Sequence, residues 1–423
     1  MELEATLGPI VGTITNNQVR ILFECSNCKQ LDFSISDGNE PINYTRDYKL
    51  ITTIDLLSKL PHTIIINGAH KCSFDPVMKS VAIISCDGDG SYKSHNYNSG
   101  NKQKAWATAN SVNATHAIHV GDQVYIDDVY DDVIQQITYK QNKEELKRAF
   151  EKEIRAVYRK SWFEDKEKHS FLASHLNFMM IDDHEIYDNF TSPSFDKSKP
   201  HMKTFLDVAA RIAGQYQIGL SQDIEIKCIT DLLNIKKIHV LENKYMKFVI
   251  VNSRLMKNET RMFDKEELKH HLHVNKKQDK LVVVDQVSPF VVAHGYTQFT
   301  QLFDLIGIDI KDHVTSNTEW IADYEWLFRK MCDSNAGKLV YVTGDLHVGQ
   351  NHTLYSINNH SKIHCLTSSP ISSNIAFQDK YNFKTLLNGL SHKFKGFHYT
   401  NNFVCFHNFV VISKRDDKMH TIS

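Results

Sequence analysis

The sequence predicts an α/β protein in which a small all-β domain precedes a larger domain of alternating strands and helices. Short apolar runs that stop at polar residues recur after residue 79, and stretches with helical spacing lie between them. Before that point the chain shows strand-like runs separated by turns. Hydrophobic residues make up 41% of the 423 residues, which is enough apolar material for a sizeable core and argues against global disorder.

Residues 1–76 have the pattern of a small β-sandwich. Strand-like segments lie at residues 20–24, 31–35 and 63–67. Asp37-Gly38-Asn39 is a turn signal between the second of these and the later strands. The one place where a short helix is conceivable is residues 55–60. We therefore expect strands to dominate this domain.

Residues 77–423 are expected to form the second domain. Apolar strand segments occur at residues 81–84, 117–120, 178–181, 248–251 and 339–342. Apolar residues recur at helical spacing over residues 146–158 and 321–331, and strand-like runs return at 403–406 and 409–412. Continuous apolar strands joined by helical crossovers indicate a sheet whose faces are covered by helices.

The composition argues against some classes of function. The 49 basic and 50 acidic side chains give a net charge of −1, which argues against a nucleic-acid binder that relies on bulk positive charge. No apolar run reaches the roughly 18 residues of a membrane span, and the N-terminus lacks the features of a signal peptide, so a cytoplasmic location is expected. Cys25 and Cys28 form the one tight cysteine pair, where we expect reduced thiols and no zinc.

Potential metal ligands follow four of the predicted strands. The segments are Ser85–Asp89, Gly121–Tyr125, Asp182–Glu185 and Gly344–His347. In open α/β sheets, ligands bind just beyond the carboxyl ends of the strands. An acidic residue after a single strand is usually a helix cap or a turn former, but four such ends would bring together carboxylates that repel one another unless a cation compensates them. We therefore predict a dinuclear metal centre.

The spacing within these segments supports this prediction. Asp345 and His347 stand two residues apart, so their side chains lie on the same side of an extended segment. Gly121 and Gly344 allow sharp turns beside the ligands. Carboxylates with one imidazole favour Mn, Fe, Ca or Mg, and a thiolate or phenolate would shift one site towards Fe or Zn.

The order of the four motifs resembles that of the calcineurin-like metallophosphoesterase superfamily, which carries Asp-x-His, Gly-Asp, Gly-Asn-His-Asp/Glu and Gly-His-x-His after successive strands. The corresponding segments here are Ser85-Cys86-Asp87, Gly121-Asp122-Gln123-Val124-Tyr125, Asp182-Asp183-His184-Glu185 and Gly344-Asp345-Leu346-His347. Their substitutions resemble the alkaline phosphatase D (PhoD-like) branch over about residues 79–370. The resemblance implies a four-layer α-β-β-α sandwich, and the opening Gly8–Gly12 resembles the β-sandwich domain that precedes it in many such proteins.

The resemblance also implies a set of metal ligands. They are Cys86, Asp87, Asp122, Tyr125, Asp183, Asp345 and His347. Asp122 would bridge a ferric-type site and a second site. Asp89 is an alternative to Asp87, and His294 resembles an isolated histidine of the wider superfamily. The implied cofactors are two or more metal ions, either Fe with Ca, or Mn, Zn or Mg.

Three further residues receive roles from the resemblance. His184 would donate a proton to the leaving oxygen. Arg254 would either clamp a phosphate oxygen or serve as a structural ion-pair partner. Asn189 matches an asparagine that follows the family's Asp-Asp-His-Glu segment, and we expect it to contact the substrate.

The expected activity is hydrolysis of phosphomonoesters through a metal-bridged hydroxide. One alternative is a phosphodiesterase that acts on lipid or nucleotide headgroups with the same ligands. Another is a non-catalytic binding module on the same fold, which the missing histidine of the first motif would favour. The sequence leaves the oligomeric state and export by a leaderless route open.

Overall fold

The computed structural model describes residues 4–88, 99–136, 142–190, 199–274, 279–289, 318–345, 347, 349–358, 360–368, 370–372, 391–394, 396–400, 402–404 and 407–422. Two antiparallel sheets open the chain. One contains β1 (Glu4–Thr15), β2 (Gln18–Ser26) and β5 (Ile51–Asp55), and the other contains β4 (Ile42–Asp47), β3 (Gln30–Ser36), β6 (His62–Ile66) and β7 (His70–Phe74). Apolar side chains that alternate along these strands, such as Val19, Phe33 and Ile64, form a common core.

Residues 55–60 contain no helix, since the chain runs from the end of β5 through bends towards β6. One expectation for this region is wrong. Cys25 and Cys28, which flank the turn between β2 and β3, are joined in a disulfide and are not reduced thiols. The domain division after residue 76 remains a prediction.

Two further sheets form the centre of the molecule. The first has the order β10 (Leu176–Met179), β9 (His116–His119), β8 (Ser80–Ile84), β20 (His407–Ser413) and β21 (Asp417–Ile422). The second has the order β11 (Ile238–Glu242), β12 (Met246–Val251), β13 (Lys280–Asp285), β14 (Lys338–Thr343), β16 (Lys362–Thr367), β15 (Gly349–Ser356), β18 (Phe397–Thr400) and β17 (Ser391–Phe394), and β19 (Phe403–Val404) pairs with β15. Strands β8, β9 and β10 are parallel, as are β12, β13, β14 and β16.

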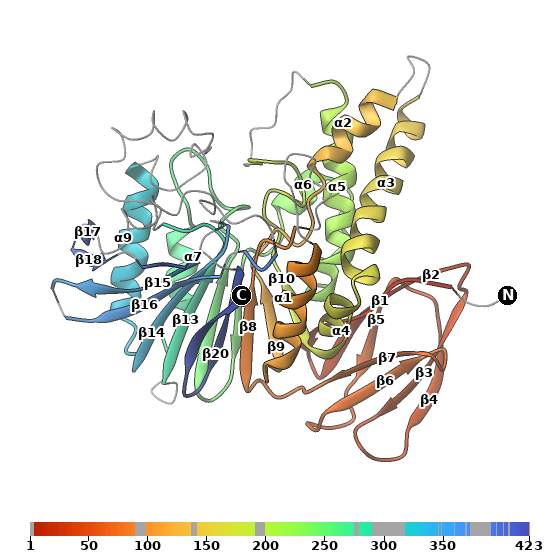
Figure 1. Ribbon diagram of the computed structural model, residues 1–423, viewed down its shortest axis with the longest axis horizontal. Helices are drawn as coiled ribbons and strands as arrows, with labels where there is room; N and C mark the ends of the chain where they lie inside the picture. Colours follow the sequence, from red (N-terminus) through yellow and green to blue (C-terminus); the bar gives the residue numbers. More distant parts are fainter. Residues whose placement is uncertain are drawn as a thin grey trace.

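Helices cover the outer faces of the two central sheets (Figure 1). On one side lie α1 (Ser99–Ser111), α2 (Asp127–Gln136), α3 (Lys143–Arg159), a π-turn (Lys160–Glu164), α4 (Lys166–Ser174), α5 (Met202–Tyr216), a 3₁₀ turn (Ile218–Leu220) and α6 (Ile229–Leu233); on the other lie α7 (Lys265–His271) and α9 (Thr318–Cys332). The inner faces of the sheets meet in a core that includes Ile83, Ile118, Phe248 and Val340. This arrangement confirms the predicted four-layer α-β-β-α sandwich with N-terminal all-β sheets.

Helix α3 illustrates how local sequence sets these elements. Asn142 caps it by accepting hydrogen bonds from the backbone N–H groups of Glu144 and Glu145, both at 3.0 Å. The Glu145 carboxylate in turn accepts from the Asn142 N–H at 3.0 Å, which completes a capping box. The apolar residues predicted at helical spacing, among them Phe150 and Ile154, are fully buried against the rest of this layer.

The N-terminal sheets are tied to the helical layer by buried polar groups. Glu24 of β2 accepts hydrogen bonds from Arg159 Nε at 2.9 Å and from the Tyr216 hydroxyl at 2.7 Å. Burial raises the pKa of Glu24, but these hydrogen bonds outweigh it and hold the pKa below its ordinary value. In addition, Asn177 of β10 donates to the carbonyl of Val11 in β1 at 2.8 Å. Within the described segments, no helix combines the length and apolarity that spanning a membrane requires.

Candidate metal centre

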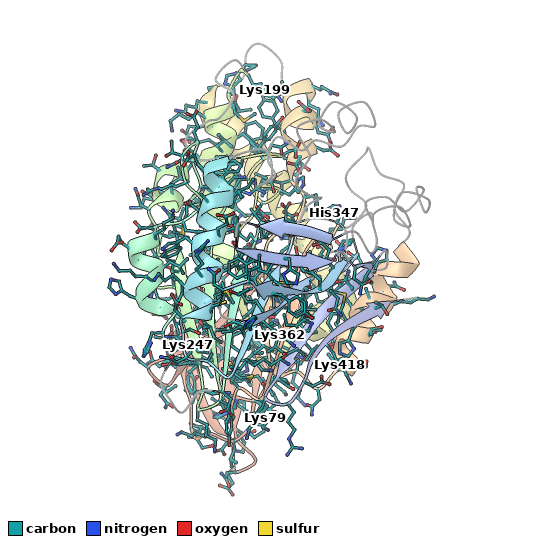
Figure 2. The ribbon with its side chains drawn as sticks, turned by 90° about the vertical axis from the view of Figure 1, so that its left-hand side faces the viewer. Lys79, Lys199, Lys247, His347, Lys362 and Lys418 are labelled. Atoms are coloured by element: carbon teal, nitrogen blue, oxygen red, sulfur yellow. A yellow bond between two sulfur atoms is a disulfide. The ribbon has the colours of Figure 1, made fainter. Side chains whose placement is uncertain are left out.

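The carboxyl ends of the parallel strands bring the four predicted motifs together. Because β8, β9 and β10 run in one direction, the segments that follow them leave the first sheet at the same edge, and the segment after β14 meets them from the second sheet. Figure 2 shows His347 well away from Lys79, the residue that immediately precedes β8. The site therefore lies at the ends where these strands finish.

One group of possible ligands joins the first, second and fourth motifs. Ligand atoms of Cys86, Asp122 and His347 all lie within 4.8 Å of one another. The Tyr125 hydroxyl lies 3.4 Å from Asp122 Oδ2 and 3.1 Å from His347 Nε2. The structure thus brings together the four residues expected at the ferric-type site, and a thiol, a carboxylate, a phenol and an imidazole suit a transition metal.

Two further groups share Asp122 with the first. Asp122, Asp183 and His184 form one, and Asp122, Asp182, Asp183 and Asp345 form the other, again with ligand atoms within 4.8 Å. Asp122 belongs to all three groups, and its role as a bridging ligand stays a prediction. Asp182 was absent from the expected ligand set, although it stands next to Asp183 in the motif.

The electrostatics of these groups favour a bound cation. Burial raises the pKa of Asp122 well above its ordinary value, and the carboxylates of Asp182 and Asp183 raise it further against the opposing effect of His184. Burial also raises the pKa of Asp182, although Arg254 opposes this. Among the described residues, the buried Oδ1 atom of Asp122 finds no hydrogen-bond partner. A cation among these oxygens would relieve both the repulsion and the missing contact, so the residues fit a metal centre.

The backbone at four of the candidate ligands adopts the left-handed region. The φ angles are 57° at Cys86, 55° at Asp122, 65° at Asp345 and 51° at His347. Residues other than glycine rarely adopt this conformation, and it concentrates at functional sites where surrounding contacts hold it. The sequence predicted that glycines beside the ligands would form the turns. The structure shows that these four candidate ligands adopt the left-handed conformation as well.

The two glycines of the motifs allow close approach between loops. Gly121 has φ +98°, and a Cβ there would collide with the Cβ of Asp182. A Cβ at Gly344 would collide with the side chain of Ser85. Glycine is therefore required at both positions for the second motif to touch the third and the fourth to touch the first.

His184 is held at the centre by a carboxylate that sequence analysis missed. Its Nδ1 lies 2.8 Å from Oδ2 of Asp127, the first residue of α2. Burial lowers the pKa of His184, but Asp127, Asp183 and Asp122 outweigh this effect and raise it well above the ordinary value. From sequence alone, Asp127 looks like an acidic residue that only stabilises the dipole of α2, so its contact with His184 was not predicted.

Among the residues that the structure describes, Asp87 belongs to none of the possible metal-binding groups. Its carboxylate is fully buried and binds the ammonium of Lys168, with Lys102 Nζ at 3.7 Å and Trp106 Nε1 at 3.1 Å. Burial raises the pKa of Asp87, yet the two lysines hold it below its ordinary value. Because this carboxylate is already compensated by two cations, we no longer propose it as a metal ligand. The alternative Asp89 lies outside the described residues, as does His294.

Arg254 is fully buried, with its guanidinium against the carboxylates of the cluster. Its Nε donates to Asp182, and Nη2 lies 3.4 Å from Asp183 Oδ1 and 3.9 Å from Asp345 Oδ1. These contacts are those of a structural ion-pair partner, and the phosphate clamp stays a prediction. Asn189 is exposed beside the cluster, and its backbone N–H donates to Asp183 Oδ2 at 2.8 Å.

Comparison with known proteins gives a structural match but no sequence match. No family model and no curated protein sequence matches the chain. The fold is similar to that of a solved structure of PhoD, with a TM-score of 0.67 over 98% of this chain and 88% of that chain, at 12% sequence identity. At this identity the similarity establishes the fold. The chain therefore has the PhoD-like fold that its motif order predicted.

Proposed function

We propose that the protein is a metal-dependent phosphoesterase of the PhoD-like type. The observation that carries this proposal is the meeting of three possible metal-binding groups at Asp122, at the carboxyl edge of a fold shared with PhoD. Cys86, Tyr125 and His347 with Asp122 would hold one ion. Asp122 with the carboxylates Asp182, Asp183 and Asp345 would hold another. Bound cations at such sites activate water and neutralise the charge of a phosphate ester.

The residues of this chain contribute orientation and a proton. Asp127 fixes the ring of His184 through Nδ1, and the surrounding carboxylates raise the pKa of the ring and so favour its protonated form in the metal-free protein. With Nδ1 bound to Asp127, Nε2 is the atom from which a proton would pass to the leaving oxygen. Arg254 stays behind the carboxylates and balances part of their charge.

Hydrolysis of a chromogenic phosphate monoester and of its bis-ester, after loading with Mn²⁺ or Fe and Ca²⁺, tests the proposal. We expect Asp122→Ala and His347→Ala to lose at least a hundredfold in rate together with bound metal. Asp223→Ala is the control, because it removes an exposed carboxylate that belongs to none of the three groups. It should change neither the hydrolytic rate nor the amount of bound metal. Full activity in both site variants would contradict the proposal. Faster hydrolysis of the bis-ester would identify a phosphodiesterase, and metal binding without hydrolysis of either would favour a binding module.

A further inference from the structure

The strained backbone at Asp122 needs support from its surroundings. Asp122 has φ 55°, it belongs to all three candidate metal groups, and it is buried. A non-glycine residue in this conformation persists when neighbouring contacts hold it there. Hydrogen bonds to the peptide groups on either side of Asp122 would provide such support.

The buried carboxylate of Glu185 binds these peptide groups from one side. Its Oε2 accepts from the backbone N–H of Asp122 at 3.1 Å and of Asp182 at 2.9 Å. Its Oε1 accepts from the N–H of Gln123 at 2.5 Å and from Gln217 Nε2 at 3.2 Å. One side chain with no exposed surface thus joins the second motif to the third through backbone hydrogen bonds.

The buried ammonium of Lys168 binds the same segment from the other side. It donates to the carbonyl of Gln123 at 3.1 Å and to the carboxylate of Asp87. The backbone N–H of Asp87 in turn donates to the Asp122 carbonyl at 2.8 Å. Ser161 of the π-turn accepts from Lys168 at 3.0 Å. Lys168 therefore joins the first motif to the second.

We propose that Glu185 and Lys168 are positioning residues that hold the Asp122–Gln123 segment in its metal-binding conformation. Glu185 fixes both N–H groups of the segment, and Lys168 fixes the Gln123 carbonyl. Neither side chain needs to touch a metal or a substrate. The two buried charges thereby set the geometry of the shared ligand before any cation arrives. This inference rests on the proposed metal centre, but its test does not depend on hydrolysis.

The test measures Mn²⁺ affinity of the full chain by electron paramagnetic resonance of free Mn²⁺, for Glu185→Gln and Lys168→Met. In Glu185→Gln, whichever oxygen becomes the amide, two donors lose their acceptor. We expect Mn²⁺ to bind about 10- to 100-fold more weakly in both variants. Glu24→Gln is the matched control, since Glu24 is another buried glutamate that binds Arg159 and Tyr216. It should lower the unfolding temperature but leave Mn²⁺ affinity within about threefold of wild type.

Hydrogen exchange provides a readout that needs no metal, and its wild-type arm does not depend on the folding of a variant. In the metal-free wild-type chain, we expect the amides of Asp122 and Gln123 to exchange slowly, and in Glu185→Gln to exchange faster. Rapid exchange of both wild-type amides would overturn the positioning role, as would wild-type Mn²⁺ affinity in both variants or an equal loss in Glu24→Gln. Failure of the wild-type chain to bind Mn²⁺, Fe or Ca²⁺ at all would instead count against the proposed function.

Discussion

Replacing Asp122 by asparagine should make the metal-free protein more stable while abolishing metal binding. Asp122 lies among carboxylates, with ligand atoms within 4.8 Å of those of Asp182 and Asp183. Burial and these neighbours raise the pKa of Asp122 well above its ordinary value. The Asp122→Asn substitution keeps the shape of the side chain and its tolerance of positive φ, but it removes the ionisable group.

The size of the effect follows from two estimates. Two unit charges 4.8 Å apart repel by about 3.5 kcal/mol at an effective dielectric constant near 20. Asp122 can avoid this repulsion by taking up a proton, which at pH 7 costs at most about 4 kcal/mol relative to the unfolded chain. Since His184 offsets part of the repulsion, we expect a gain of about 1–3 kcal/mol in the free energy of unfolding.

The raised pKa of Asp122 also determines how its contribution to stability depends on pH. A carboxyl group whose pKa is raised on folding binds its proton more tightly in the folded state. The contribution of Asp122 to the stability of the metal-free protein is therefore fully present below about pH 4, the pKa of an unfolded aspartate, and is lost as the pH rises. Asp122→Asn should flatten this dependence.

Urea unfolding in the presence of a chelator at several pH values measures the effect, and Mn²⁺ titration measures metal binding. Asp87→Asn is the control of opposite sign, because that carboxylate compensates the buried Lys168. Leaving a buried charge unpaired typically costs about 3–5 kcal/mol, so Asp87→Asn should destabilise the protein. The reasoning fails if metal-free Asp122→Asn is less stable than wild type, or if it binds Mn²⁺ with unchanged affinity.

Three further predictions concern groups around the centre. Asp127→Asn should lower the hydrolytic rate at least tenfold while the metal content stays near that of wild type, as measured by steady-state kinetics and elemental analysis. His184→Ala should behave in the same way. Loss of the metal in His184→Ala would show that this histidine is a ligand. Burial raises the pKa of Asp285 to about 6. Its contribution to stability is thus present below about pH 4 and lost as the pH rises through 6, and Asp285→Asn should reduce the fall in unfolding free energy over this range. Gly121→Ala should cost about 2 kcal/mol or more in thermal unfolding and weaken Mn²⁺ binding, because the added methyl group meets Asp182 at a positive φ; an unchanged melting temperature would show that the two loops can separate freely.

The layers of the fold were predictable because their signal is local. Apolar runs such as residues 81–84 and 117–120 ended at polar motifs, and the structure places β8 and β9 there. Strand β13 was not singled out, although Lys280–Asp285 has the same apolar run ending in an acid. The N-terminal disulfide was missed because a Cys-x-x-Cys pair alone does not reveal its oxidation state.

The centre was less predictable because side-chain direction is not local. Cys86 and Asp87 are neighbours, yet Cys86 Sγ lies 3.5 Å from Asp122 whereas Asp87 turns to a lysine 81 residues further along the chain. Nothing in the first motif indicates that partner. Similarly, the motif around Arg254 suggests a guanidinium that contacts phosphate. The sequence does not reveal that this side chain is buried against Asp182, because its burial depends on how the two sheets pack.

The contacts of Glu24 and Asn177 have a practical consequence for work with shortened chains. Deleting the opening strands would remove Leu7 and Ile10 of β1 from the core that they share with the helical layer, and would expose the apolar side chains packed against them. It would also strip Arg159 of its carboxylate acceptor. Loss of activity in such a fragment would then reflect a damaged scaffold, and it would say nothing about whether the β-sandwich recognises a substrate.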